Sequence, residues 1–231
     1  MNFLQLAQKL RQKCGGSGTG PATVVGQTGE SKDFVDWINE AWLLIQAHES
    51  NWKWMRKPFS FTTTAGKNFY LPSATVGETG ITDLAKYHDL DSWRCYLTAT
   101  GRTDEGFLVP WHYQLWRDAY DFGANATLQD RPSVFAIRDN DRAIMLGPIP
   151  NDVYTITGEY QSVPTELADD TDVPGLPDRF HMAIVYRAMM LYAKQEAAQE
   201  VYADGEEEFN KMLAALRIDQ LESPALGEPL A

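Results

Sequence analysis

Cysteine is scarce in this sequence, with Cys14 and Cys95 far apart in different kinds of segment. That spacing fits neither a disulfide framework nor a metal site, so we expect two free thiols in a reducing compartment. Long apolar runs are missing too. Polar residues interrupt the apolar positions of the first turns, so no signal-peptide core is expected, and no stretch approaches the ~20 apolar residues of a membrane span. These absences predict a protein made and kept in a cytoplasm, with no membrane partner.

Basic residues are the minority: the sequence has 20 Lys and Arg and 32 Asp and Glu, which gives a net charge of −12. Residues 1–57 carry 7 basic and 5 acidic side chains, residues 58–163 carry 8 and 13, and residues 164–231 carry 5 and 14. A protein that grips DNA phosphates gains affinity through clustered Lys and Arg. Tight duplex binding is therefore not expected, whereas a surface past which DNA slides without being held fits these numbers.

The signatures of catalysis, metal binding and nucleotide binding are missing as well. The four His have neither a second His at helical spacing nor a Cys pair beside them, and no Gly-x-Ser-x-Gly elbow is present. His181 favours a hydrogen-bonded imidazole in a core or an interface. Gly15–Pro21 looks like a phosphate-binding loop, but neither the preceding strand nor the closing Gly-Lys is there, so a flexible connection is favoured.

An acidic loop around Asp169, Asp170 and Asp172 offers oxygen ligands for a hard cation. It lacks the glycine and the terminal Glu of a calcium loop, so a solvated acidic turn is favoured. We therefore predict no catalytic residue, no cofactor and no metal.

Helical periodicity occupies both ends of the chain. Residues 2–14 and 31–48 predict amphipathic helices. The most apolar helix is expected over 177–202, starting at Pro177 and stopped by Asp204-Gly205, with a further helix opening at Glu206 as its antiparallel partner. Between Met182 and Ala193 its only charge is Arg187, so no wide polar face is left for water. This helix must be packed on several sides, as a bundle axis or a subunit contact, and the residues expected in the core or interface are Met182, Val185, Met189 and Met190.

The middle of the chain changes to a twofold period. We expect a hairpin from 59–63 and 68–71, a strand over 93–98, a second hairpin from 133–138 and 143–146, and a strand over 153–160. A short helix is expected over 110–122, with Pro110 at its first position. Antiparallel strands in succession predict a meander.

The predicted fold class is therefore α+β, a small helical bundle with an inserted antiparallel β-rich subdomain. The bundle comprises 1–57 and 164–222, the insert 58–163, and an extended C-terminal tail 223–231. The tail holds two Pro and one Gly, with Leu226 and Leu230 as its only large side chains. Such a segment is expected to order only against a partner.

Two aromatic groups admit other functions. Asn51–Lys57 alternates Trp with cations, which suits base stacking on single-stranded nucleic acid but is favoured here as a helix-to-strand junction. Trp93, Trp111 and Trp116 would form a sugar platform if 58–163 were a carbohydrate-binding or hydrolytic module.

Several stretches together resemble the head-to-tail adaptor, or connector, proteins of tailed bacteriophages. The likeness covers almost the whole chain in order, and its motifs are scaffold motifs without chemical specificity. The matching stretches are Gly20-Pro21, Val35–Asn39, Trp52–Lys57, Phe59–Phe61, Leu146–Pro150, Thr157–Tyr160 and Leu176–His181.

The resemblance implies a structural virion protein of the neck, assembled in the host cytoplasm. Such adaptors form a dodecameric ring below the portal protein, extend the DNA channel and dock the stopper or tail, while the C-terminal tail engages the portal. A stopper or tail-completion protein of the same neck is the alternative. The β insert is larger than in the mostly helical adaptors. By this likeness the portal-docking residues are Pro224, Leu226, Pro229 and Leu230.

Overall fold

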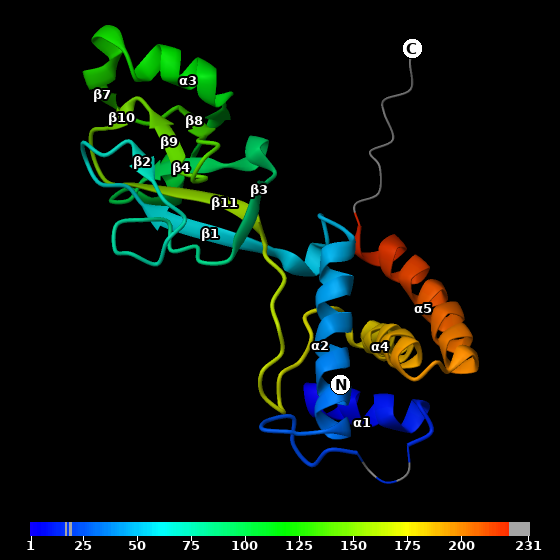
Figure 1. The fold of residues 1–231 in the computed structure, drawn as a ribbon. Coiled ribbons are helices and arrows are strands. Elements are labelled where there is room, and N and C mark those ends of the chain that lie inside the picture. The colour runs from blue at the N-terminus through cyan, green and yellow to red at the C-terminus, as the bar shows by residue number, and fades with distance from the viewer. Residues whose placement is uncertain (17, 19, 222–231) are drawn as a thin grey trace, which may run out of the picture. The chain divides into compact units, whose positions relative to one another are not determined.

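The computed structural model describes residues 1–16, 18 and 20–221. It divides into two compact units, of which unit 1 comprises Met1–Met55 and Pro164–Ala231 and unit 2 comprises Arg56–Val163. Helices dominate unit 1 at both ends of the chain and strands dominate unit 2 (Figure 1). The fold is therefore α+β, as predicted.

Unit 1 is a helical bundle built around its most apolar helix. Its helices are α1 (Phe3–Lys13), α2 (Glu30–His48), α4 (His181–Gln195) and α5 (Gln199–Gln220). Helix α4 contacts each of the other three, which confirms that it is packed on several sides. Its buried residues face more than one direction, so the other three helices must cover it on several sides. The buried residues are His181, Ala183, Ile184, Val185, Ala188, Met189, Met190 and Ala193.

The junction between α4 and α5 differs from the sequence prediction. A single 3-10 turn, Asp178–Phe180, follows Pro177, α4 ends at Gln195, and α5 begins at Gln199. The chain reverses through Ala197, whose φ of 52° is uncommon for a residue with a side chain.

Gly205 is thus no helix terminator, and it lies inside α5. A Cβ placed on it would be 3.1 Å from the carbonyl oxygen of Tyr186 and 3.2 Å from Cβ of Met189, both on α4. The prediction that 177–202 forms one helix ending at Gly205 is wrong, because this glycine permits a close helix crossing. The antiparallel pairing itself is confirmed, since Lys194 faces Tyr202 and Arg187 faces Phe209.

Unit 2 contains two main sheets among its described strands. The strands are β1 (Arg56–Thr62), β2 (Phe69–Tyr70), β3 (Leu84–His88), β4 (Arg94–Leu97), β5 (Gly106–Phe107), β6 (Val109–Pro110), β7 (Gln129–Asp130), β8 (Val134–Ile137), β9 (Ile144–Gly147), β10 (Ile149–Pro150) and β11 (Tyr154–Ser162). The first sheet has the order β1-β11-β4-β5, with β3 also paired to β11, and the second has the order β2-β9-β8-β6. Strands β7 and β10 form a short parallel pair.

The two sheets and one helix form three layers in unit 2. Phe135 of β8 stacks on Trp93 beside β4 with ring centroids 4.2 Å apart, so the sheets share one core. The neighbouring residues Val134 and Ala136 point the other way and meet Trp116 of helix α3 (Tyr113–Tyr120). Alternation along β8 therefore serves two cores, one on each face of its sheet. Figure 1 shows α3 on one side of β8 and β9 and the first sheet on the other.

The strand partners differ from those predicted. The hairpin of β8 with β9 is confirmed, but β1 does not pair with β2. Instead β1 pairs along its whole length with β11, from Arg56 opposite Gln161 to Thr62 opposite Thr155, while β2 pairs with β9 in the other sheet. The meander is therefore wrong as well, since the first strand of the unit pairs with the last. A twofold pattern reports which face of a strand is buried and not which strand lies beside it.

Helix α3 also begins later than predicted. Pro110 belongs to β6, and the N-cap of α3 is His112, whose Nδ1 accepts a hydrogen bond from the backbone N–H of Gln114 at 3.4 Å. Sequence alone does not separate the two sites, because a first helical position and a short edge strand both tolerate a missing N–H.

Two glycines of unit 2 lie under large aromatic rings. A Cβ on Gly158 of β11 would be 2.7 Å from Nε1 of Trp93, and a Cβ on Gly147 of β9 would be 2.7 Å from ring atoms of Tyr120. Real Cβ atoms do not approach so closely. Each ring can therefore pack against the strand only because the residue beneath it is glycine.

We expect Gly158→Ala to destabilise unit 2 by about 1–3 kcal/mol, because the added methyl displaces the indole of Trp93 from the shared core. Urea denaturation followed by tryptophan fluorescence measures the loss. The matched control is Glu159→Ala, one residue along the same strand and half exposed, which should change stability by less than about 0.5 kcal/mol. Equal midpoints for the two variants would contradict the close packing.

His181 is a buried core imidazole, as predicted. Its Nδ1 lies 2.5 Å from the terminal amine of Met1, and its Nε2 lies 3.1 Å from the carbonyl oxygen of Leu176. An amine that donates to Nδ1 leaves Nε2–H to donate to the carbonyl, which defines a neutral tautomer. Burial, and next the positive amine, lower the pKa of His181 below its usual 6.5, outweighing the nearby carboxylate of Asp178.

Unit 1 should therefore lose stability as the solution is acidified. Because the folded pKa of His181 is depressed, the unfolded chain binds its proton first, and stability present above about pH 6.5 is lost as the pH falls toward the folded pKa. Denaturation midpoints at pH 7.5 and 5.5 measure the loss, and His181→Gln should flatten the pH dependence. An unchanged slope in this variant would assign the acid sensitivity to other groups.

Candidate docking surfaces

The α4 residues singled out from the sequence lie within unit 1. Val185 is fully buried, Met189 and Met190 are nearly so, and Met182 is half-buried against the same cluster. All four pack against the core of their own chain. Met190 has a second role, because it also lines a groove between α2, α4 and α5.

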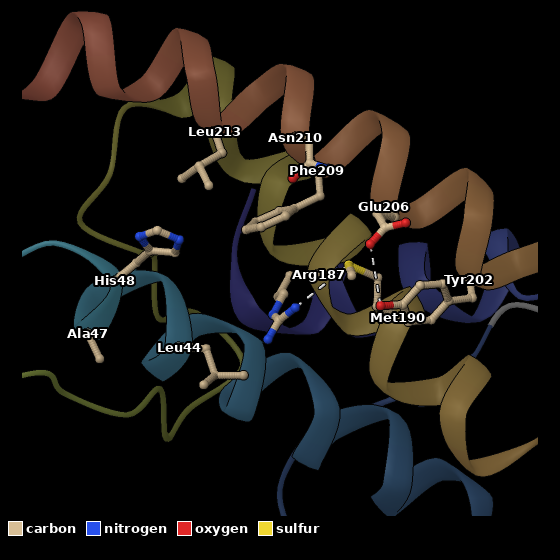
Figure 2. A pocket seen from close by; sticks show the side chains of 10 residues that line it. All are labelled: Leu44, Ala47, His48, Arg187, Met190, Tyr202, Glu206, Phe209, Asn210 and Leu213. Atoms are coloured by element: carbon tan, nitrogen blue, oxygen red, sulfur yellow. Dashed lines mark hydrogen bonds between the residues drawn. The ribbon is translucent and has the colours of Figure 1, made fainter.

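This groove has a volume of about 520 Å³, and we call it the α4 groove. Apolar side chains from all three helices form most of its walls, and Leu44 on α2 stays 38 % exposed. His48 and Leu213 lie at one end and Tyr202 and Glu206 at the other (Figure 2). The lining residues are Leu44, Ala47, His48, Arg187, Met190, Tyr202, Glu206, Phe209, Asn210 and Leu213.

Arg187 lies in the middle of the α4 groove (Figure 2). Its guanidinium lies 5.7 Å from the ring centroid of Phe209, and one of its nitrogens donates to Sδ of Met190 at 3.8 Å. Both are weak partners for a permanent cation. Within the described part of the chain, no carboxylate forms an ion pair with it. The groove therefore contains a half-buried positive charge, and residues 1–16, 18 and 20–221 provide no carboxylate to pair with it.

The two ends of the groove differ in charge. At one end Arg217 donates to Glu49 at 2.9 Å and lies 3.3 Å from Nδ1 of His48, which joins the last turn of α5 to the end of α2. At the other end Tyr202 donates to Glu206 at 3.5 Å. A carboxylate entering the groove is therefore attracted to its middle and opposed at the Glu206 end.

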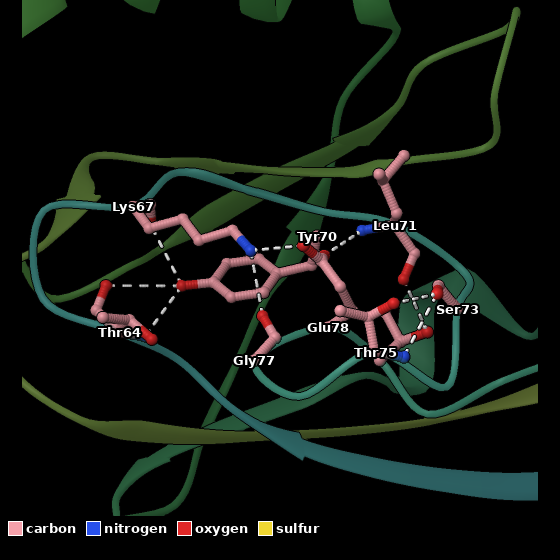
Figure 3. A network of polar contacts seen from close by, with 9 residues as sticks. Thr64, Lys67, Tyr70, Leu71, Ser73, Thr75, Gly77 and Glu78 are labelled. Atoms are coloured by element: carbon pink, nitrogen blue, oxygen red, sulfur yellow. Dashed lines mark hydrogen bonds and ion pairs between the residues drawn. The ribbon is translucent and has the colours of Figure 1, made fainter.

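A second candidate surface is the loop that follows β2 in unit 2. Glu78 pairs with Nζ of Lys67 at 2.6 Å and accepts from the backbone N–H of Leu71 at 2.6 Å. The Tyr70 hydroxyl accepts from the N–H of Thr64 and donates to the carbonyl of Lys67, each at 2.9 Å (Figure 3). Burial raises the pKa of Tyr70 to about 12, so this hydroxyl keeps its proton. The network holds in place a loop whose tip presents Val76, 99 % exposed.

The aromatic alternatives are not supported by burial. Trp93 and Trp116 are fully buried, and half-buried Trp111 packs against the cluster around Trp116, so these residues do not form a sugar platform. Trp52 is also fully buried and donates to the carbonyl of Ile45 at 2.9 Å. Its ring stacks on Trp54 at 4.3 Å, as expected of a helix-to-strand junction.

The acidic loop acts as a set of backbone caps. Asp170 accepts from the N–H of Val24 at 2.6 Å, and Asp172 accepts from the N–H groups of Ala168 and Asp169. These N–H groups lower the pKa of Asp172. Among the described residues no cluster of three metal-ligating side chains occurs.

The cysteines are free, as predicted. Burial raises the pKa of Cys95 to about 11 and that of Cys14 to about 12, so both are protonated thiols at neutral pH and poor nucleophiles. None of the helices in the described ranges is long and apolar enough to cross a membrane. The predicted portal-docking residues Pro224, Leu226, Pro229 and Leu230 lie outside the described residues.

Sequence reasoning missed the α4 groove, although one signal pointed to it. Arg187 is the only charge between Met182 and Ala193, and the residues three and four positions away are Ala183, Ile184, Met190 and Leu191. None of them can pair with it along the helix. A lone cation on an apolar helix therefore marks a site that needs an acceptor from elsewhere.

Comparison with known proteins agrees with this picture of a binding scaffold. A search of curated proteins found no match. The family model described as SU10 adaptor protein matches residues 1–228, which include both units. The chain therefore belongs to the SU10 adaptor protein family, a family of phage head-to-tail adaptors, and has a structural role in the virion where head and tail join.

Proposed function

We propose that the protein forms a homo-oligomeric ring below the portal, extends the DNA channel and docks the tail or stopper. The family match over residues 1–228 carries this proposal, because an adaptor must bind a portal on one side and tail-side proteins on the other. A head-to-tail contact repeated by rotation closes into a ring. Twelve copies are the number that the family resemblance implies.

Unit 1 is the proposed ring body. Its helices share one core with α4 inside, which supports a rigid body that can be repeated around an axis. The net charge of −12 is consistent with a channel through which DNA moves without being bound, since clustered cations would bind the DNA phosphates. Assembly would take place in the host cytoplasm, and the mature location would be the neck of the virion.

The segment 223–231 is the proposed portal-docking tail. Pro224 and Pro229 disfavour helix and favour an extended backbone, and Leu226 and Leu230 offer two apolar anchors. A stopper or tail-completion protein is the second candidate, and its preferred partner would be a tail-side protein instead of the portal.

Deleting residues 223–231 should leave the fold intact and abolish binding to the portal protein of the same genome. Analytical ultracentrifugation of the purified chain, alone and mixed with portal, measures ring-sized complexes, and circular dichroism checks the fold. The double variant Leu226→Asp with Leu230→Asp should also abolish binding, and the matched control Ser223→Ala should leave it unchanged. Retained binding by the truncated chain would contradict the tail assignment, and a full chain that stays monomeric beside portal would contradict the adaptor ring.

A further inference from the structure

We infer that the α4 groove is the binding site of residues 222–231 of the same chain, with the Arg187 guanidinium donating to one of their carboxylates. The groove requires an occupant that brings a negative charge to its middle and apolar side chains to its walls. It also requires an occupant without Lys or Arg, because a second cation beside Arg187 would repel it.

The sequence of this segment meets those requirements. Residues 222–231 read ESPALGEPLA, with Glu222 and Glu228, two leucines and no basic residue. The prolines at 224 and 229 disfavour a helix and favour an extended conformation, whose leucines could enter an apolar groove between helices. The chemistry is therefore that of an acidic, extended, leucine-bearing peptide.

Residues 222–231 also begin at one end of the α4 groove. It follows Leu221 directly, and α5 forms one wall of the groove. Lys53 donates to the carbonyl of Asp219 at 3.2 Å and Arg217 bonds Glu49, so the chain leaves α5 at the His48 end of the groove.

The distances along the chain allow the segment to fold back. From Leu221 back to Leu213 the helix rises about 12 Å, and back to Phe209 about 18 Å. Extended chain from Leu221 spans up to about 17 Å at Leu226 and about 24 Å at Glu228. Leu226 can therefore reach the wall at Leu213, and Glu228 can reach Arg187 with length to spare for the reversal.

The charges inside the groove select one arrangement. Glu206 at the far end opposes a further carboxylate there, whereas Arg187 has no carboxylate partner among the described residues. Glu228 is thus placed on Arg187, and the apolar residue Leu230 continues toward Met190.

This inference rests on the proposed function in one respect, namely that the same segment engages the portal in the ring. The groove would then retain the tail in the free subunit and yield it to the portal. Docking in the groove is nevertheless a property of the single chain and is measured without portal.

The test uses the full chain with a photo-reactive phenylalanine analogue at position 226. Irradiation of the monomer followed by mass spectrometry should give cross-links within one chain to 44–48 and 209–213. Arg187→Gln should lower the yield about tenfold, because a charge-assisted hydrogen bond is lost. Lys194→Gln, also on α4 but not lining the groove, is the matched control and should leave the yield unchanged.

Glu228→Gln changes no residue of the four helices of unit 1 and provides a second test. It should lower the cross-linking yield as much as Arg187→Gln does. The exchanged pair, Arg187→Glu with Glu228→Arg, should restore it. Cross-links spread over unit 2, a main product of two joined chains, or a yield indifferent to both Arg187→Gln and Glu228→Gln would overturn the inference. Loss of portal binding with intact groove cross-links would overturn only the proposed function, and portal binding with no groove cross-links only this inference.

Discussion

Burial of α4 is the constraint on which unit 1 depends. A helix with Ile184, Val185, Met189 and Met190 facing different directions has no side that is stable in water, so α1, α2 and α5 must enclose it. Helix α5 crosses α4 closely at Gly205. A Cβ added to this glycine would lie only 3.1 Å from the carbonyl oxygen of Tyr186 on α4. The α4 groove between α2 and α5 leaves a gap in this enclosure, and there the helix carries its one charge between Met182 and Ala193.

Glycine also allows close packing in unit 2, where aromatic rings lie over the backbone. Its sheets and α3 approach closely because Gly158 lies under Trp93 and Gly147 under Tyr120. Large rings thereby pack between the layers, at the cost of backbone positions that accept no side chain. Both glycines fall in stretches that resemble phage adaptors, which gives a packing reason for motifs that carry no chemistry.

Local patterns in the sequence predicted the elements better than their partners. The helices at both ends, the strands of the middle and the α+β class followed from hydrophobic period alone. The pairing of β1 with β11 could not, because alternation at Phe59 and Phe61 specifies a buried face that several strands can cover. The end of α4 was also hidden, since Glu196–Ala198 contains neither Gly nor Pro and the nearest glycine serves the helix crossing.

The candidate site was hidden for the opposite reason, because a single arginine makes no motif. Yet a chain that needed only to fold would gain stability from Leu or Met at position 187, since a half-buried cation that has no carboxylate partner in residues 1–16, 18 and 20–221 keeps part of its desolvation cost. Arg187 instead keeps its charge between a thioether and an aromatic ring, both weak acceptors. A carboxylate that enters the groove would offset this cost, so the charge favours a bound state of the α4 groove over an empty one.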